Sequence, residues 1–152
     1  MKTLYEILKE SADLYKIFLE LEYKKYDIAI KDDIVALDDI VSKEQVFYLK
    51  MRGLEQKREK LIEEMGMKGK SIKEIIELSD EEQRPMLIEA YDELYKLISD
   101  VKKISNLCKT VIEVRMNRIH KAMSQLGEKK NTYSNEEGKY NNSKSLILSK
   151  KI

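Results

Sequence analysis

Apolar residues recur at steps of three and four along the first thirty positions, which gathers their side chains on one face of an α-helix. Ser11 and Lys25 fill the remaining positions of this face. Asp32 and Asp33 follow, and either can accept the free amide hydrogens that begin a new helix. The pattern predicts a helix over about residues 3–30, with apolar positions Leu4, Ile7, Leu14, Phe18, Leu21 and Ile28.

A second helical pattern covers about residues 33–65. Gly66 and Gly69 end it, because glycine readily adopts the left-handed conformation that closes many helices. The apolar positions of this helix are Leu37, Ile40, Val41, Phe47, Tyr48, Met51, Leu54, Leu61 and Ile62.

Two capping-box patterns come next. Ser71-Ile-Lys-Glu74 predicts a short helix over residues 71–78, and Ser79-Asp-Glu-Glu82 predicts the start of a long one, with Pro85 in its first turn. The long helix is predicted over about residues 80–126, with Gly127 as its end. Its apolar positions are Leu87, Leu94, Ile98, Val101, Cys108, Ile112, Ile119, Ala122 and Leu126.

Long helices with heptad-like apolar faces, joined by short turns, pack side by side as antiparallel hairpins. We therefore expect an all-α fold: an elongated antiparallel helical hairpin or three-helix bundle with coiled-coil-like packing over residues 1–127. Residues 128–152 are rich in Asn, Ser and Lys and carry no helical apolar pattern. They are predicted to form a flexible C-terminal tail.

The composition supports the helical prediction and indicates a cytoplasmic protein. Charged residues make up 38% of the chain, with a single Pro and a net charge of only +1, so no overall field attracts nucleic acid or a membrane. No apolar run approaches the roughly 18 residues that a membrane-spanning helix needs. The lone Cys108 fits a reducing compartment, and charges come too early in MKTLYEILKE for a secretory signal.

No pattern typical of an enzyme is present. The single histidine, His120, lies outside any metal-binding motif and is predicted to be solvated or half-buried at the edge of the apolar face. Cys108 lies within the apolar face, where a cysteine acts as a small hydrophobic residue. Arg115, Arg118 and Lys121 are too few for a nucleic-acid module. We therefore expect no enzymatic activity, no cofactor, no metal and no nucleic-acid partner.

Helix lengths suggest where a partner binds. At 1.5 Å per residue, the helix over residues 33–65 is about 50 Å long and the long helix over residues 80–126 is about 65–70 Å long. Residues 113–126 should therefore extend about 15–20 Å beyond the turn that joins the first two helices. This stretch remains apolar, which marks an interaction site for a partner helix. The expected contacts are Met116, Ile119, Met123 and Leu126, with Leu107, Val111 and Val114 on a neighbouring face.

Other interpretations of the same stretch are open at this level. The apolar face is equally compatible with ordinary core covered by the tail or by the 71–78 helix, and with burial in a homodimer. A homodimeric helical scaffold or adaptor without an export role is accordingly the alternative function.

The order of these features resembles the FlgN family of flagellar export chaperones over essentially the whole chain. An acidic turn at residues 31–33 leads to the second helix, then a short capped segment, a long helix with Asn106, and a tail containing Tyr133 and Gly138. A Ser-containing stretch with aliphatic residues follows at 143–148. The second helix carries the residues typical of the family, Leu37, Ile40, Glu44 and Arg58.

The resemblance implies a function without chemistry. The second half of the long helix and the tail would hold the C-terminal helices of the hook–filament junction proteins FlgK and FlgL and deliver them to the flagellar export gate. Tyr133 is the candidate for docking to that gate, although it is equally an ordinary aromatic residue of a tail. A homodimer is possible when no client is bound. The family's paired asparagines reduce here to Asn106, which leaves the extent of the client groove open.

Overall fold

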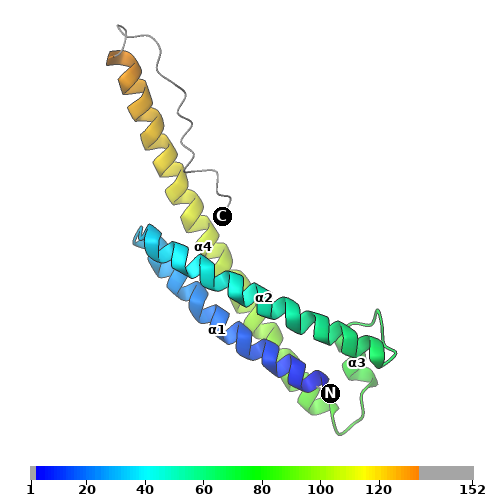
Figure 1. The fold of residues 1–152 in the computed structure, drawn as a ribbon. Coiled ribbons are helices and arrows are strands. Elements are labelled where there is room, and N and C mark those ends of the chain that lie inside the picture. Colours follow the sequence, from blue (N-terminus) through cyan, green and yellow to red (C-terminus); the bar gives the residue numbers. More distant parts are fainter. Residues whose placement is uncertain (1–2, 134–152) are drawn as a thin grey trace. The chain divides into compact units, whose positions relative to one another are not determined.

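The computed structural model describes residues 3–133, and the side chains of residues 3–128. All regular structure in this range is helical: α1 (Leu4–Ile30), α2 (Ile34–Glu64), α3 (Ile72–Leu78) and α4 (Arg84–Tyr133), as Figure 1 shows. The predicted all-α fold is therefore confirmed. The chain divides into two compact units, Met1–Glu113 and Val114–Ile152, and α4 contributes to both. Most of the predicted tail, including Gly138 and residues 143–148, lies outside the described residues.

Local sequence sets where the first three helices begin. The Thr3 side chain accepts a hydrogen bond from the Glu6 amide at the start of α1, and the Asp33 carboxylate accepts one from the Ala36 amide at the start of α2. Ser71 and Glu74 form the predicted reciprocal capping box of α3. Each cap satisfies amide groups that have no partner within the helix, which fixes the helix start.

The predicted second capping box at Ser79 is wrong. Ser79 ends α3 instead, and its hydroxyl donates to the Ile76 carbonyl at 2.6 Å. The chain then turns through residues 80–83, and α4 begins at Arg84, whose amide donates to the Asp80 carbonyl at 3.0 Å. A serine between two helices can cap either of them, and here its hydroxyl satisfies a carbonyl at the end of the first.

The predicted end of the long helix at Gly127 is also wrong, since α4 continues to Tyr133. Among the described residues, the glycines with positive φ are Gly66 at 69° and Gly69 at 86°, which follow α2 as the sequence predicted. Gly127 is not among them. A glycine inside a helix costs only about 1 kcal/mol relative to alanine, so it weakens a long helix without ending it. Residues 128–133, predicted as tail, are therefore helical.

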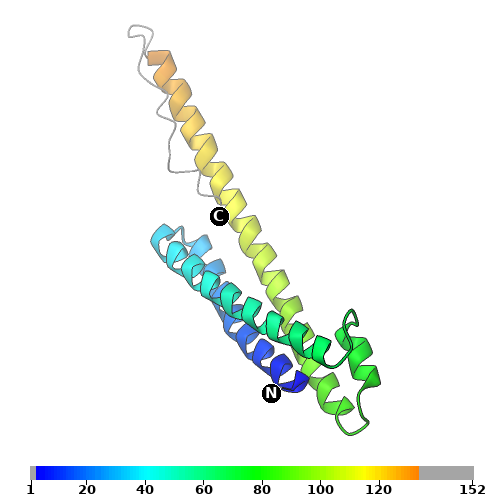
Figure 2. The same cartoon turned by 45° about the vertical axis from the view of Figure 1, so that its right-hand side comes forward.

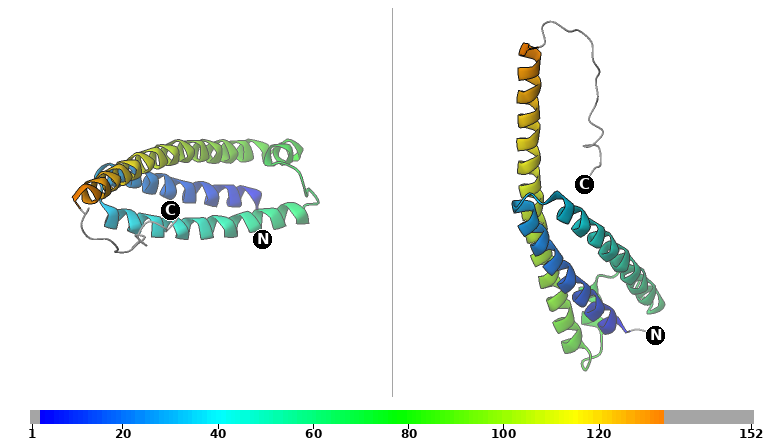
Figure 3. Two further views of the ribbon diagram at one scale, coloured as in Figure 1. Left: turned by 90° about the horizontal axis from the view of Figure 1, so that it is seen from above. Right: turned by 60° about the vertical axis from the view of Figure 1, so that its left-hand side comes forward.

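Within the first unit, α1 lies between α2 and the first part of α4 (Figure 3), and α3 lies beside the start of α4 (Figure 2). One core cluster joins all four helices near α3. Its buried members are Leu4, Leu8, Ala12, Ile62, Ile75, Ile76, Leu87, Ala90 and Leu94. A second cluster joins α1, α2 and α4 through Phe18, Phe47 and Val101, with the Phe18 and Phe47 rings stacked 3.9 Å apart. These clusters hold the first unit together.

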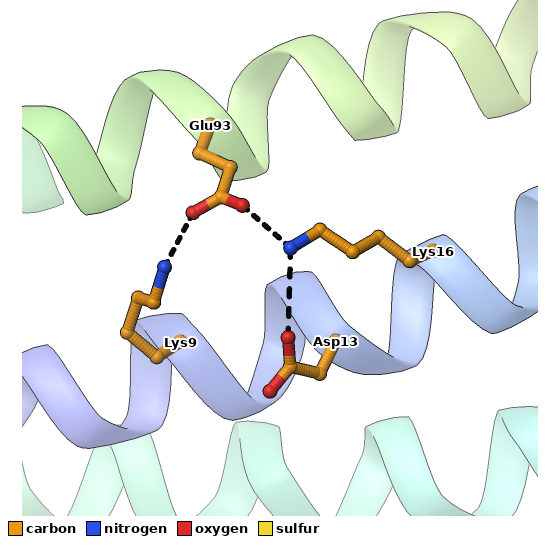
Figure 4. Close-up of polar contacts among 4 residues, drawn as sticks. All are labelled: Lys9, Asp13, Lys16 and Glu93. Carbon is orange, nitrogen blue, oxygen red and sulfur yellow. Dashed lines mark hydrogen bonds and ion pairs between the residues drawn. The ribbon is translucent and has the colours of Figure 1, made fainter.

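A polar contact on the surface also joins α1 to α4. The Glu93 carboxylate of α4 accepts hydrogen bonds from Lys9 at 2.7 Å and Lys16 at 2.6 Å, and Lys16 also pairs with Asp13 (Figure 4). All four side chains are at least 30% exposed, so these ion pairs add little to stability. They are consistent with the parallel alignment of α1 and α4 that the core sets.

Candidate functional site

The apolar face of α4 is buried along its first half and exposed along its second. Buried positions recur from Leu87 to Cys108, and no residue from 109 to 128 is buried. At about 100° per residue, the same face continues beyond Cys108. The residues that continue it, called the distal stripe below, are Met116, Ile119, Met123 and Leu126.

The distal stripe is exposed in the structure. Ile119 is 44% exposed, Met123 49% and Leu126 61%, and Met116 is half-buried. An exposed fraction this high at three successive positions of one helix face is unusual, because a helix in a soluble protein normally buries its apolar face. The stripe therefore has the character of a binding surface.

The other three predicted contacts lie on a different face of α4. Leu107 is 53% exposed, Val114 is 45% exposed, and Val111 is half-buried. Helical geometry places these residues, called the side strip below, about a third of a turn from the distal stripe. The seven residues thus share one helix but form two separate apolar strips. A client that contacts both has to wrap around α4 or use two helices.

A buried polar cluster holds α4 to α1 just before the helix becomes exposed. Glu22 of α1 is only 1% exposed, and its carboxylate accepts a hydrogen bond from the Ser105 hydroxyl at 2.8 Å. The Cys108 thiol donates to the Glu22 carbonyl oxygen at 3.4 Å. Burial raises the pKa of that thiol to about 11, so Cys108 stays protonated and unreactive at neutral pH.

The same cluster extends to α2. Lys25 of α1 forms an ion pair with Glu44 of α2 at 2.8 Å, and Glu44 is itself only 6% exposed. Burial raises the pKa of Glu22 to about 7, with a further increase from the neighbouring Glu44 and an opposing effect of the Ser105 hydrogen bond. Lys25 is thus the nearby positive charge for two buried carboxyl groups, those of Glu22 and Glu44. The cluster joins α1, α2 and α4, and its contribution to folding stability depends on whether Glu22 is protonated.

The remaining predicted residues lie as follows. His120 is exposed on α4, and Asn106 is exposed one position before the side strip, where its carbonyl accepts from the Thr110 hydroxyl at 3.0 Å. Tyr133 is the last residue of α4, and its side chain lies outside the described part. Over the residues that the structure describes, no group of three His, Cys, Asp or Glu side chains could hold a metal ion. None of the described helices is long and apolar enough to cross a membrane.

One apolar surface was not predicted. Ile17 of α1 and Leu49 of α2 are 65% and 67% exposed, and both line a groove between these helices. Both residues lie outside the apolar patterns that predict the core, and that departure is itself the signal for a second surface. Large apolar residues off the core face of two neighbouring helices indicate something that covers them.

Comparison with known proteins identifies a family. A sequence model of the FlgN protein family matches residues 1–144. No curated protein and no solved structure matches the chain. The match includes the core clusters, the distal stripe, the side strip and Tyr133.

Proposed function

This chain belongs to the FlgN family, and on that premise we propose that the distal stripe and the side strip of α4 are the surface on which it holds its clients. FlgN proteins are cytoplasmic chaperones of flagellar export, and their clients are the hook-associated proteins FlgK and FlgL. They are not enzymes. Family membership therefore favours the chaperone over a scaffold without an export role.

The observation that supports this site is the change in burial along one face of α4. The face packs in the core as far as Cys108 and then continues, exposed, through Ile119, Met123 and Leu126. A helix presenting such a stripe can accept the apolar face of a second amphipathic helix. Methionine suits this role because its flexible thioether adapts to more than one partner shape, and the chain has two named clients to accommodate.

Binding of this kind explains chaperoning without chemistry. The C-terminal helices of FlgK and FlgL are the proposed ligands, and their apolar faces would associate prematurely if left exposed. Covering those faces with the α4 surface prevents that association, and release needs no bond to break. Ile119 and Met123 are about half exposed before binding. Formation of the complex removes their apolar surface and that of the client helix from water, which stabilises the complex.

Docking to the export gate is assigned to a separate residue. Tyr133 ends α4, seven positions after the last residue of the distal stripe. We assign it to the gate because it follows the proposed client surface in the chain and belongs to the Tyr133–Gly138 element that resembles the tail of FlgN proteins. Tyr133→Ala should leave client binding unchanged and reduce secretion of FlgK, whereas Tyr133→Phe reports whether the hydroxyl is needed. Loss of client binding in Tyr133→Ala would instead place this residue in the client site.

The client site is tested by adding charge to the distal stripe. In Ile119→Asp with Met123→Asp, two apolar side chains worth about 1.5–3 kcal/mol each on burial are lost, so affinity for FlgK should fall by more than about 100-fold. Binding is measured by titration calorimetry with purified FlgK. Helical content by circular dichroism should stay unchanged, because both side chains are already exposed.

A matched control adds the same charge on another side of the same stretch. Asn117 and Ser124 are exposed on α4 and point about a third of a turn away from the middle of the distal stripe. Asn117→Asp with Ser124→Asp should bind FlgK as the unmodified chain does. Equal loss in both double variants would show a general effect of charge and remove the support for this surface. Unfolding of the Ile119/Met123 variant would show that the stripe is core.

A further inference from the structure

The first unit has a second apolar surface, remote in sequence from the client site. It is a groove of about 490 Å³ between α1 and α2, called the α1–α2 groove below. Its apolar lining comes from Leu14 and Ile17 of α1 and from Leu49 and Leu54 of α2. Ile17 and Leu49 are each about two-thirds exposed, so the walls of the groove are accessible as well as apolar.

The groove also has room for an entering side chain. Gly53 of α2 lies in its lining, and a Cβ atom placed on that glycine would meet no atom within 4 Å. A partner can therefore place a large side chain over Gly53, where it would pack against Ile17 and Leu49. Small residues let helices approach closely, as helix–helix packing requires.

The charges of the groove are divided by helix. Glu10 and Asp13 lie on α1, and Lys50 and Lys57 lie on α2. One wall is thus acidic and the other basic. Because α1 and α2 run antiparallel, with Phe18 stacked on Phe47, these acidic and basic residues occupy the same stretch of the hairpin.

This division of charge is self-complementary. If a second copy is rotated by 180° about an axis parallel to the helices, its α1 lies opposite α2 of the first copy, and its α2 lies opposite α1. The acidic wall then meets the basic wall twice, and Ile17 of each copy meets Leu49 of the other. A single helix from another protein would need basic residues along one side and acidic residues along the other to pair with both walls. A second copy of this chain already carries both kinds of residue, on its α2 and its α1.

We propose that the α1–α2 groove is the surface through which two copies of this chain associate, as a two-fold symmetric four-helix contact of α1 and α2 from each copy. The occupant is a second copy because complementary charge and apolar surface lie on the same face. The contact leaves α4 free, so it differs from a dimer that buries the distal stripe. It is also independent of the proposed client site.

Reversing the charge of one wall at a time tests the proposal. Lys50→Glu with Lys57→Glu makes both walls acidic, and Glu10→Lys with Asp13→Lys makes both walls basic. Each variant alone then faces like charges, and its dimer dissociation constant should rise at least about 30-fold. A mixture of the two variants restores every opposite-charge pair, so the mixture should form heterodimers. Sedimentation velocity at low salt measures both.

A control separates the groove from net charge. Lys102→Glu with Lys109→Glu makes the same charge change at the same seven-residue spacing, on exposed positions of α4 outside the groove. It should dimerise like the unmodified chain. The Ile119/Met123 double Asp variant should also remain dimeric, because the distal stripe takes no part in this contact.

Three results would overturn the proposal. A monomeric unmodified chain at up to millimolar concentration would show that a second copy is not the occupant. Dimers that persist in both charge-reversed variants would place the contact elsewhere. Failure of the mixed variants to form heterodimers, with each variant folded by circular dichroism, would contradict the two-fold arrangement. None of these outcomes bears on FlgK binding, which the α4 variants test separately.

Discussion

The Ser105 hydroxyl of α4 donates a hydrogen bond to the Glu22 carboxylate of α1, with the two oxygens 2.8 Å apart. This bond joins two helices inside the first unit, where Glu22 is almost fully buried and its second carboxylate oxygen has no hydrogen-bond partner among the described residues. A buried carboxyl with one unsatisfied oxygen is easier to keep neutral than charged. The helix that carries the proposed client surface is thus held to α1 by a carboxyl group whose charge depends on pH.

Glu22→Gln should change how stability depends on pH. The folded-state pKa of Glu22 is raised from 4.5 to about 7, which means that the folded chain favours the protonated carboxyl. The contribution of Glu22 to folding stability is therefore fully present below pH 4.5 and is lost as pH rises through 7. The free energy of unfolding of the unmodified chain should therefore fall by about 1–3 kcal/mol more than that of the variant between pH 5 and 8. Urea denaturation of both proteins measures this. Parallel pH profiles would show that Glu22 does not titrate as argued.

Phe47→Ala should strongly destabilise the first unit. Phe47 is buried, stacks on Phe18 at 3.9 Å and meets Tyr15 edge-on at 5.4 Å, so its removal leaves a cavity between α1, α2 and α4. The expected loss is about 3–5 kcal/mol in the free energy of unfolding. Tyr48→Ala is the matched control, because Tyr48 is 52% exposed and should cost far less. Similar losses for the two variants would contradict the packing described.

Glu93→Gln should have little effect despite its two lysine partners. Its contacts with Lys9 and Lys16 are exposed to solvent, and such ion pairs are worth less than about 1 kcal/mol. The hydrogen bonds from Lys16 and Lys9 lower the pKa of Glu93. Any contribution of Glu93 to folding stability is therefore present at pH values above the ordinary pKa of a glutamate and is lost as pH falls. Chemical denaturation at pH 7 is the measurement. A loss above 2 kcal/mol would show that the pair orders the α1–α4 contact, contrary to the burial argument.

Gly127→Ala should strengthen α4 by up to about 1 kcal/mol, because Gly127 lies inside the helix and an added Cβ meets no atom within 4 Å. Slower hydrogen exchange of the neighbouring amides would report the gain. Gly66→Ala should do the opposite at the end of α2, since φ is 69° there and disfavours any residue with a side chain. A destabilised Gly127→Ala variant would restore the interpretation of Gly127 as a helix end.

The sequence predicted helix starts well because capping depends on residues three positions apart. Asp33 and Ser71 accept the amides that their local sequence indicates. The same rule failed at Ser79, where two helices compete for one serine and only the surrounding fold decides between them. It failed again at Gly127, because the cost of glycine is small compared with the stability of a long helix.

The core and the candidate site could be predicted to different extents. Apolar periodicity identified the face of α4 that packs and then becomes exposed, and it identified Phe18 and Phe47 as core. It did not reveal Glu22 and Glu44 as buried, because a glutamate in a charged helix usually points to solvent. Burial of such a group depends on Ser105 and Lys25, whose proximity to it only the packing of three helices creates.

The central claim is that clients bind the apolar surface of α4, and hydrogen exchange of the intact chain with and without FlgK tests it most directly. Amides of an exposed helix open often, and a client laid along that helix slows the opening. The account predicts new protection concentrated in residues 107–126, with little change in α1 and α2. Protection confined to the α1–α2 hairpin, or no protection in a complex that forms, would contradict it.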